Sequence, residues 1–460
     1  MNQERIQILD SMSVYKAISR LALPTVLGMV VQILYNITDT FFIGKLNDPN
    51  QLAAITLAMP ITMLTMAISS IIGTGGSAYL SRMIGANNFA QAQKTLNVSI
   101  LYCVALGIFL TIISLLFLKP LVTLLGASTH TFSYTYNFCF IILLFSAVIM
   151  LNFSLGQLLR SEGAVKESLN GMLIGTVLNI VLNPVFVLIL GMGIVGSAIA
   201  TVIANFIGVI YYLCCYRSKS KQSMFALAPN KFSFDRTITF QMLSIGIPAA
   251  LGQILMSVGN IVSNNYAAAY GDLTVASMGV ATRAFIIPLF IILGIAIGCQ
   301  PLMGFSFGAG NYTRLKEVVN KATFLCTITG LLFFVLFLLF SRQSMMFFSS
   351  NKEVIELGTL ILHALILSLP FLGIQFTITT AVQSMGKVVP SLILSISRQG
   401  LLYIPAILIL TKLFGFKGFI YSQAITDILI MIISIGVWVT IFRGLKKTSS
   451  EPETESLSIV

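Results

Sequence analysis

A single carboxylate, Asp39, lies inside an otherwise apolar run of membrane-spanning length, and it is the residue best suited to chemistry in this sequence. A charged side chain at membrane depth costs about 2.5 to 3.5 kcal/mol, so such residues usually face a polar cavity or a partner on an ion or substrate pathway. On a helix Gln32, Asn36 and Asp39 fall on one side, because their spacing is i, i+4 and i, i+7. We therefore expect a polar stripe that faces a polar cavity or an ion or substrate pathway.

A second polar pair, Asn179 and Asn183, stands one helical turn apart in a later apolar segment. Pro184 follows directly, and a proline inside a helix frees the carbonyl of residue 180 for a cation or a water. Asp39 and Asn183 each lie within about two turns of the outer end of their segments, so the two side chains can meet. The pattern places polar oxygens together inside an apolar region, although amides that only join helices by hydrogen bonds would look the same.

The second half of the chain has a different polar set, Arg283, His363, Arg398 and Asp427, placed near the middle of apolar segments. Arginine cannot release its proton, so we expect Asp427 to neutralise one of the two arginines. We interpret this cluster as structural or gating rather than catalytic. A lone histidine such as His363 is more often a satisfied interior residue than a proton carrier.

The composition indicates an integral membrane protein. Of 460 residues, 57% are hydrophobic and only 9% are charged, and the mean hydropathy is +0.94; soluble proteins have about 25% charged residues. The net charge of +12 is spread over short connections rather than gathered in a patch, which argues against nucleic acid as a partner. The six cysteines lie in apolar segments and show neither disulfide-framework nor metal-site spacing.

The chain contains twelve apolar segments long enough to cross about 30 Å of hydrocarbon. They lie near residues 16–44, 51–77, 92–119, 130–156, 165–190, 193–216, 237–268, 272–300, 315–341, 354–384, 386–412 and 417–443. Nineteen Lys and Arg residues fall in the connections on the N-terminal side of the membrane and six on the other side. The positive-inside rule therefore predicts a multi-pass protein of the cell membrane with both termini in the cytoplasm.

Motifs recur along the chain at a nearly constant offset of 222 to 224 residues. The matching pairs include Pro24 with Pro248, Gly85 with Gly308, Gly163 with Gly386, and Gly196 with Gly418. Six spans separate the copies, so we expect an all-α membrane protein of two six-helix bundles, related by a pseudo-two-fold axis along the membrane normal. The expected divisions are an N-terminal lobe (1–216), a cytoplasmic linker (217–236), a C-terminal lobe (237–443) and a disordered cytoplasmic tail (444–460).

Several motifs in order carry a family resemblance: YNITDTFFIG, SRMIGANN, NIVLNPVF, ATRAFIIP, IGCQPLMGFSFGAGNYTRLKE, SISRQ and QAITD. Together they resemble the multidrug and toxic compound extrusion (MATE) family over nearly the whole chain, most closely its bacterial DinF-like and MepA-like branches. The resemblance implies a two-lobed efflux pump that exchanges H⁺ or Na⁺ for organic, often cationic drugs. It also implies a cation site in the N-terminal lobe, where Asp39 and Asn179 match family positions and Asn183 departs from the aspartate that many relatives have. The expected cation-coupling residues are Asp39, as the main coupling carboxylate, with Asn36, Asn179 and Asn183.

The cleft between the lobes is expected to bind drugs through flexible thioethers, aromatic faces and a few amides. The candidates are Gln32, Tyr35, Met59, Met63, Met66, Met256, Asn260, Met278 and Met303. No nucleophile–base pair, metal cluster or phosphate loop stands out in the sequence, so we expect a transporter and not an enzyme, with no cofactor besides the coupling H⁺ or Na⁺. The expected partners are small-molecule drugs, that ion and the lipid bilayer, and the expected state is a monomer.

Two alternatives stay open. A flippase for lipid-linked oligosaccharides, from the same wider superfamily, should line its cleft with several basic residues, whereas only Arg283 and Arg398 lie within spans. A membrane scaffold without transport activity would tolerate Asp39→Asn in any functional assay. The sequence leaves open the drug list, the coupling ion and its stoichiometry.

Overall fold

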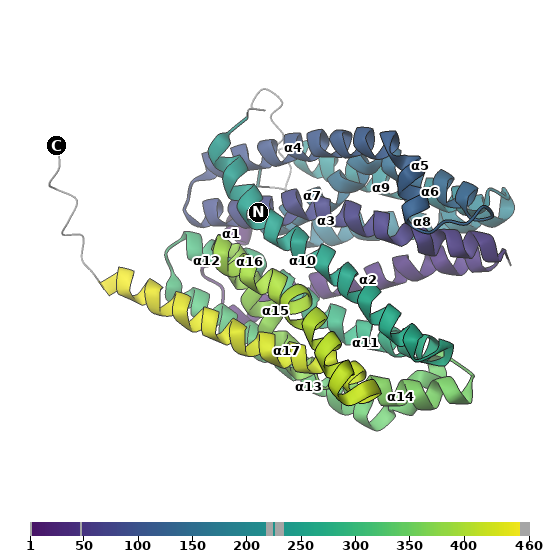
Figure 1. Cartoon of the computed structure of the whole chain (residues 1–460). Helices are drawn as coiled ribbons and strands as arrows, with labels where there is room; N and C mark the ends of the chain where they lie inside the picture. The colour runs from purple at the N-terminus through teal and green to yellow at the C-terminus, as the bar shows by residue number, and fades with distance from the viewer. Residues whose placement is uncertain (1, 47, 218–223, 226–233, 451–460) are drawn as a thin grey trace.

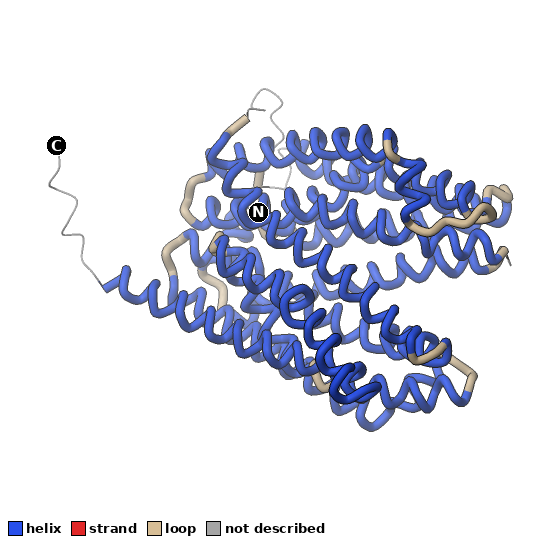
Figure 2. Tube along the Cα trace, viewed as in Figure 1, coloured by secondary structure: helices blue, strands red, loops and turns tan. Residues whose placement is uncertain are grey.

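The computed structural model describes residues 2–46, 48–217, 224–225 and 234–450 (Figure 1). The side chains of residues 2–4, 35–37, 39, 40 and 446–450 lie outside this description. The described residues form helices joined by short loops and contain no strand (Figure 2). This confirms the prediction of an all-helical membrane protein.

The described residues of the first half of the chain form ten helical elements. They are α1 (Asn2–Asp10), α2 (Val14–Gly44), α3 (Pro49–Gly85), α4 (Phe89–Leu116), α5 (Leu118–Leu124), α6 (Phe132–Leu144), α7 (Ser146–Ser161), α8 (Val165–Pro184), the π-helix η1 (Val185–Ile189) and α9 (Gly193–Arg217). We call the first half the N-lobe.

The second half, the C-lobe, repeats this plan. Its elements are α10 (Arg236–Ala269), α11 (Asp272–Gly298), α12 (Gln300–Gly308), α13 (Tyr312–Phe348), α14 (Lys352–Ile366), α15 (Leu369–Ser384), α16 (Val388–Ile396), the π-helix η3 (Ser397–Tyr403) and α17 (Ile404–Ser450). In Figure 1 the purple and blue N-lobe lies above the green and yellow C-lobe.

Within the described residues, nine helices are long and apolar enough to span a membrane, or up to 11 if each bent pair counts as one span. The bent pairs are α6 with α7, at 54°, and α14 with α15, at 46°, so the expected spans 130–156 and 354–384 are broken and not straight. Gly415, with φ +58°, interrupts α17 between the expected spans 386–412 and 417–443. A left-handed backbone of this kind suits glycine, which has no Cβ.

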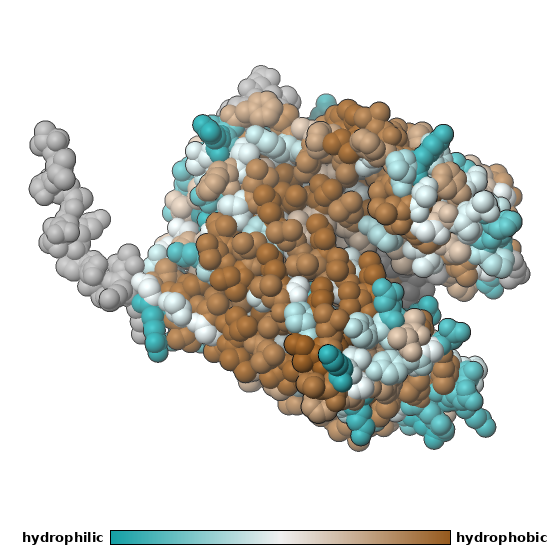
Figure 3. Space-filling model, in the orientation of Figure 1, coloured by the Kyte–Doolittle hydropathy of each residue, from teal (hydrophilic) through white to brown (hydrophobic). Residues whose placement is uncertain are grey.

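Apolar side chains cover the middle of the molecule and hydrophilic ones gather towards its two ends (Figure 3). Phe109, Leu116 and Leu339, for example, are more than half exposed. A soluble protein would bury such residues, whereas lipid tails solvate them without penalty. This distribution fits helices that cross a bilayer, with the apolar middle in the hydrocarbon and the hydrophilic ends in the two aqueous phases.

The lobes meet through two pairs of long helices, α2 with α11 and α3 with α10. Gly75 of α3 lies against the carbonyl of Met242, and Gly246 of α10 lies against the carbonyl of Ile71. A Cβ at either glycine would collide with that backbone, so the close crossing of α3 and α10 requires both glycines.

One segment differs from the sequence prediction, because α17 continues through residue 450 into the tail 444–460 that was expected to be disordered. The short helix α1 precedes the first of the twelve expected spans. Residues 451–460 lie outside the described part of the chain, as does most of the expected linker 217–236.

Candidate functional site

A chain of hydrogen bonds between amides and a hydroxyl crosses the inside of the N-lobe. Asn183 donates from Nδ2 to Asn179 Oδ1 at 3.3 Å, and Asn179 donates from Nδ2 to Thr201 Oγ1 at 3.2 Å. On α9, Asn205 donates to the Thr201 carbonyl at 2.8 Å, and Asn152 of α7 donates to Asn205 Oδ1 at 2.8 Å. We call these five residues the N-lobe network; they are neutral, and they tie α7, α8 and α9 together.

The network lies beside an irregular stretch of backbone. Asn179 and Asn183 are fully buried on α8, and Pro184 begins the change from α-helix to the π-helix η1. Proline lacks the N–H that would continue the helix, and π-helical turns occur often at functional sites. Carbonyl groups near this turn are suited to bind water or a cation.

The sequence analysis missed Thr201, Asn205 and Asn152 as members of this network. Thr201 and Asn205 are one turn apart on α9, which is the spacing that singled out Asn179 and Asn183 on α8. That signal could have found them. Asn152 had no such partner in its segment.

The side chains of Tyr35, Asn36 and Asp39 lie outside the described residues, so the structure makes no statement about their contacts. The backbone of α2 that carries them is described, and α2 packs along α8. Gly28 of α2 approaches the end of the Met172 side chain on α8, which brings these helices close. The polar stripe of α2 and the polar pair of α8 are thus on neighbouring helices.

The substrate candidates divide by exposure. Met59, Met63 and Met66 of α3 are exposed, as are Met256 and Asn260 of α10. Gln32 and Met278 are half-buried.

Met303 is the exception, because it is 0% exposed and packs in the core on the short helix α12. The expectation that Met303 lines an open cleft is therefore wrong for this structure. Composition alone could not show that its helix is enclosed on all sides.

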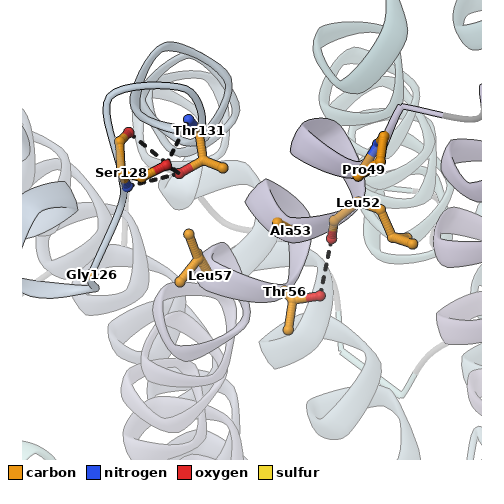
Figure 4. Close-up of a pocket in the computed structure, with 8 residues that line it drawn as sticks. All are labelled: Pro49, Leu52, Ala53, Thr56, Leu57, Gly126, Ser128 and Thr131. Carbon is orange, nitrogen blue, oxygen red and sulfur yellow. Dashed lines mark hydrogen bonds between the residues drawn. The ribbon is translucent and has the colours of Figure 1, made fainter.

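A cavity of about 560 Å³ lies at the start of α3 (Figure 4). Its lining comes from α3 and from the connection between α5 and α6, and comprises Pro49, Leu52, Ala53, Thr56, Leu57, Gly126, Ser128 and Thr131. The hydroxyl groups of the lining form hydrogen bonds within the protein. Thr56 donates to the Leu52 carbonyl at 3.0 Å, and the Ser128 and Thr131 hydroxyls share a hydrogen bond. Drug-sized ligands occupy cavities of about 300 to 1,000 Å³, so this mainly apolar space is large enough for one.

Asp48 caps α3 next to this cavity. Its carboxylate accepts hydrogen bonds from the Gln51 side chain at 3.0 Å and from the Asn50 N–H at 2.9 Å. The Gln51 side chain contributes most to lowering the pKa of Asp48 below its usual value, so this carboxylate is ionised at neutral pH. The end of the N-lobe at the start of α3 therefore carries a negative charge at Asp48.

In the C-lobe a buried ion pair takes the place of neutral amides. Arg398 of η3 donates from Nε to Asp427 Oδ1 at 3.0 Å, and Asp427 is fully buried on α17. Gln423 donates from Nε2 to both oxygens of Asp427 at 3.1 and 3.2 Å, and the Arg398 guanidinium lies 4.9 Å from the centre of the Phe376 ring. We call Arg398 and Asp427 the C-lobe pair.

The four residues expected to share mid-membrane depth do not form one cluster. The structure pairs Asp427 with Arg398, whereas Arg283 is exposed on α11. His363 of α14 shares a hydrogen bond with Ser341 of α13 at 2.9 Å. Depth along a helix says nothing about which face a side chain occupies, and the faces differ here. In the described part of the chain no group of His, Cys, Asp and Glu side chains is arranged to hold a metal ion.

The MatE family model matches the chain twice, over residues 24–185 and 248–409. This chain belongs to the MatE family. The two matches begin at Pro24 and Pro248, the residues that anchor the internal repeat, so each lobe corresponds to one copy of the MatE unit. The resemblance to the MATE family found in the sequence is thereby confirmed.

Similar MatE relatives include two staphylococcal proteins. The chain is 30% identical to the multidrug export protein MepA of Staphylococcus haemolyticus (strain JCSC1435), over 93% of this chain and 94% of that one. It is 29% identical to MepA of Staphylococcus aureus (strain MSSA476), with the same shares covered.

Solved structures of MATE proteins share the fold across the whole length. A MATE crystal structure in the bent conformation has a TM-score of 0.91 at 27% identity, and covers 97% of this chain and 99% of that one. An outward-facing multidrug resistance MATE transporter has a TM-score of 0.91 at 27% identity, with 96% and 98% covered. The two-lobed architecture is therefore the one expected for the MatE family.

Proposed function

We propose that this chain exports amphipathic, often cationic drugs across the cell membrane in exchange for a coupling cation. The two staphylococcal relatives are named as multidrug export proteins, and the chain aligns with them over 93% of its length. Its role is that of a multi-pass membrane transporter rather than an enzyme, with both termini in the cytoplasm.

The observation that carries the coupling scheme is the neutrality of the N-lobe network. Its hydrogen bonds join Asn183, Asn179, Thr201, Asn205 and Asn152, and none of these side chains titrates near neutral pH. The helix α2, which packs against α8, carries the carboxylate Asp39. Proton binding and release are therefore assigned to Asp39.

A low dielectric favours the neutral form of a carboxyl group. Asp39, which the sequence places inside an apolar segment, would in this way take up a proton from the outer side. Release of this proton towards the cytoplasm then returns Asp39 to its ionised form for the next transport cycle. Protons are favoured over Na⁺ because Asn183 contributes no charge, so a Na⁺ ion here would meet one carboxylate and several neutral oxygens.

Drug binding is assigned to the exposed faces of α3 and α10, which diverge from the crossing at Gly75 and Gly246. The thioethers of Met59, Met63 and Met66 offer adaptable apolar contacts on one side. On the other side Met256 and the Asn260 amide add a polar contact. Broad specificity follows from such a surface, because few of its contacts demand a fixed geometry.

Transport by alternating access requires the two lobes to rock about this crossing. MATE structures in a bent and in a straight conformation resemble this chain with TM-scores of 0.91 and 0.88, which supports a fold that can adopt more than one arrangement. The cavity beside Asp48 would then offer a last apolar contact to a drug cation that leaves on the outer side.

The deciding experiment is dye efflux from proteoliposomes with the pH and sodium gradients imposed separately. We expect the pH gradient alone to drive accumulation of an amphipathic cationic dye, and the sodium gradient alone to have little effect. Accumulation driven by sodium at equal pH would overturn the proton assignment. Absence of efflux with either gradient would favour the scaffold reading.

A further inference from the structure

The N-terminal helix α1 is anchored to the N-lobe at one end. Arg5 forms an ion pair with Glu167 of α8 at 3.0 Å, and both side chains are mostly buried. Leu9, which is fully buried, lies against Gly163 in the turn between α7 and α8. Gly163 has φ +79°, so this turn is shaped by a residue without a Cβ.

The other end of α1 is held by the C-lobe. Arg314, in the first turn of α13, donates from Nε to the Leu9 carbonyl at 3.1 Å and from Nη2 to the Met12 carbonyl at 2.9 Å. Carbonyl groups at the C-terminal end of a helix lack helical donors and carry partial negative charge, so a guanidinium is a suitable partner. Arg314 lies 302 and 305 positions from these two acceptors along the chain.

The helix α1 lies beside a close backbone contact between the two lobes, formed by α3 and α12. Gly85 at the end of α3 lies against the carbonyl of Phe305, and Gly308 at the end of α12 lies against the carbonyl of Arg82. These contacts are reciprocal and join equivalent positions of the repeat. The helix α1 packs on α12 beside this crossing.

The helix itself depends on these contacts. It has only nine residues, and its sequence NQERIQILD is mainly polar. Helices shorter than about 12 to 15 residues are marginal in water, so α1 is held by tertiary contacts rather than by its own propensity. An element of this kind can detach when its anchors are lost.

We propose that residues 2–12 form a strap that keeps the cytoplasmic side of the two lobes closed. Arg314 must release the strap before the cleft can open to the cytoplasm. This inference rests on the alternating access proposed above. It assigns Arg314 and Glu167 a regulatory role that neither the drug surface nor the N-lobe network needs.

The test is a distance measurement between spin labels at A90C and K387C, one exposed position in each lobe, in an otherwise cysteine-free full-length protein. Arg314→Ala should raise the population with the longer distance by about ten-fold or more, because losing even one of the two hydrogen bonds from this charged group accounts for about ten-fold. Glu167→Gln, which loosens the other anchor, should shift the population in the same direction. This second variant keeps the test valid if Arg314→Ala does not fold.

A matched control removes a charge from α13 without touching the strap. Lys316 lies over the Phe442 ring, so Lys316→Ala should leave the distances unchanged. An equal shift in this control, or unchanged distances in folded Arg314→Ala and Glu167→Gln proteins, would overturn the strap. If the parent protein shows one distance under every pH and drug condition, alternating access fails and the strap fails with it.

Discussion

The two lobes share one repeat but use it for different polar interiors. In the N-lobe, amides on α8 and α9 form a neutral network next to η1. In the C-lobe, η3 and α17 carry Arg398 and Asp427, which form a buried ion pair. Both interiors lie beside a π-helix, so the irregular backbone is common to the lobes and the charges are not.

This difference suggests that the two lobes have different roles in transport. A neutral network can accept an added proton or cation nearby without losing an existing ion pair. The C-lobe pair is already satisfied, because Asp427 also accepts two hydrogen bonds from Gln423. Breaking a buried pair is strongly unfavourable, so the C-lobe is expected to move as a stiff body while the N-lobe responds to the ion.

Asp39→Asn should give the largest effect. The N-lobe network contains no carboxylate, so this substitution removes the acidic group to which proton coupling is assigned. We expect gradient-driven dye efflux to fall to the level of empty liposomes while equilibrium drug binding stays largely intact. Dye efflux and dye-binding fluorescence on the same preparation measure the two properties. Asp272→Asn, at the exposed start of α11, serves as the control. The comparison breaks down if Asp39→Asn still concentrates dye against its gradient.

Asp427→Asn should act on stability rather than coupling, since it leaves the buried Arg398 without its counter-charge. Loss of one partner of a buried pair destabilises by about 3 to 5 kcal/mol, which should lower both the yield of folded protein and the thermal midpoint. Thermal unfolding in detergent measures this. The double variant Arg398→Met, Asp427→Leu should recover most of the loss, because no charge remains buried. Normal stability of Asp427→Asn combined with selective loss of transport would contradict the structural role.

Asn183→Asp sharpens the comparison by adding a charge to the neutral lobe. The new carboxylate would offer Na⁺ a second formal charge, so we expect either sodium-stimulated efflux at constant pH or a shifted pH optimum. Efflux rates across a pH series, with and without sodium, check this. Asn320→Asp on α13 places the same charge on an exposed site of the other lobe, away from the drug surface, as a control. The role given to Asn183 fails if neither ion dependence nor pH profile changes.

Lys94→Met should have the smallest effect, because the Lys94–Asp235 pair, at 2.6 Å, is partly exposed. The hydrogen bond from Lys94 is the largest cause that lowers the pKa of Asp235 below its ordinary value of 3.8. A lowered pKa stabilises the folded state at neutral pH, and this contribution is lost as the pH falls through the folded-state pKa. We expect Lys94→Met to destabilise by less than about 1 kcal/mol at neutral pH, with the difference vanishing in acid.

Unfolding of the Lys94→Met protein across pH measures this loss, with Lys387→Met, an exposed lysine, as the control. A loss of stability as large as that of Asp427→Asn would show that solvent exposure does not explain the difference in strength between the Lys94–Asp235 pair and the C-lobe pair.

Much of the fold was predictable because a bilayer permits few alternatives. Apolar segments of about 20 residues must form helices, since lipid offers no partner to an open backbone group. The end of η1 at Ile189 and the start of α9 at Gly193 agree with the break expected at residues 190–193. The pair Asn179 and Asn183 could be recognised because its i, i+4 spacing fixes both side chains on one face of α8.

Only the tertiary structure decided which polar side chains meet. Arg283 and Arg398 were equally good partners for Asp427 by depth, and the rotation of each helix about its axis chose Arg398. Met303 and Met63 are alike in sequence terms, yet the packing around α12 buries one of them and leaves the other exposed. The helix α1 has no apolar period of its own; it exists because Glu167 and Arg314, 162 and about 300 positions away, hold it in place, and such distant contacts leave no local signal.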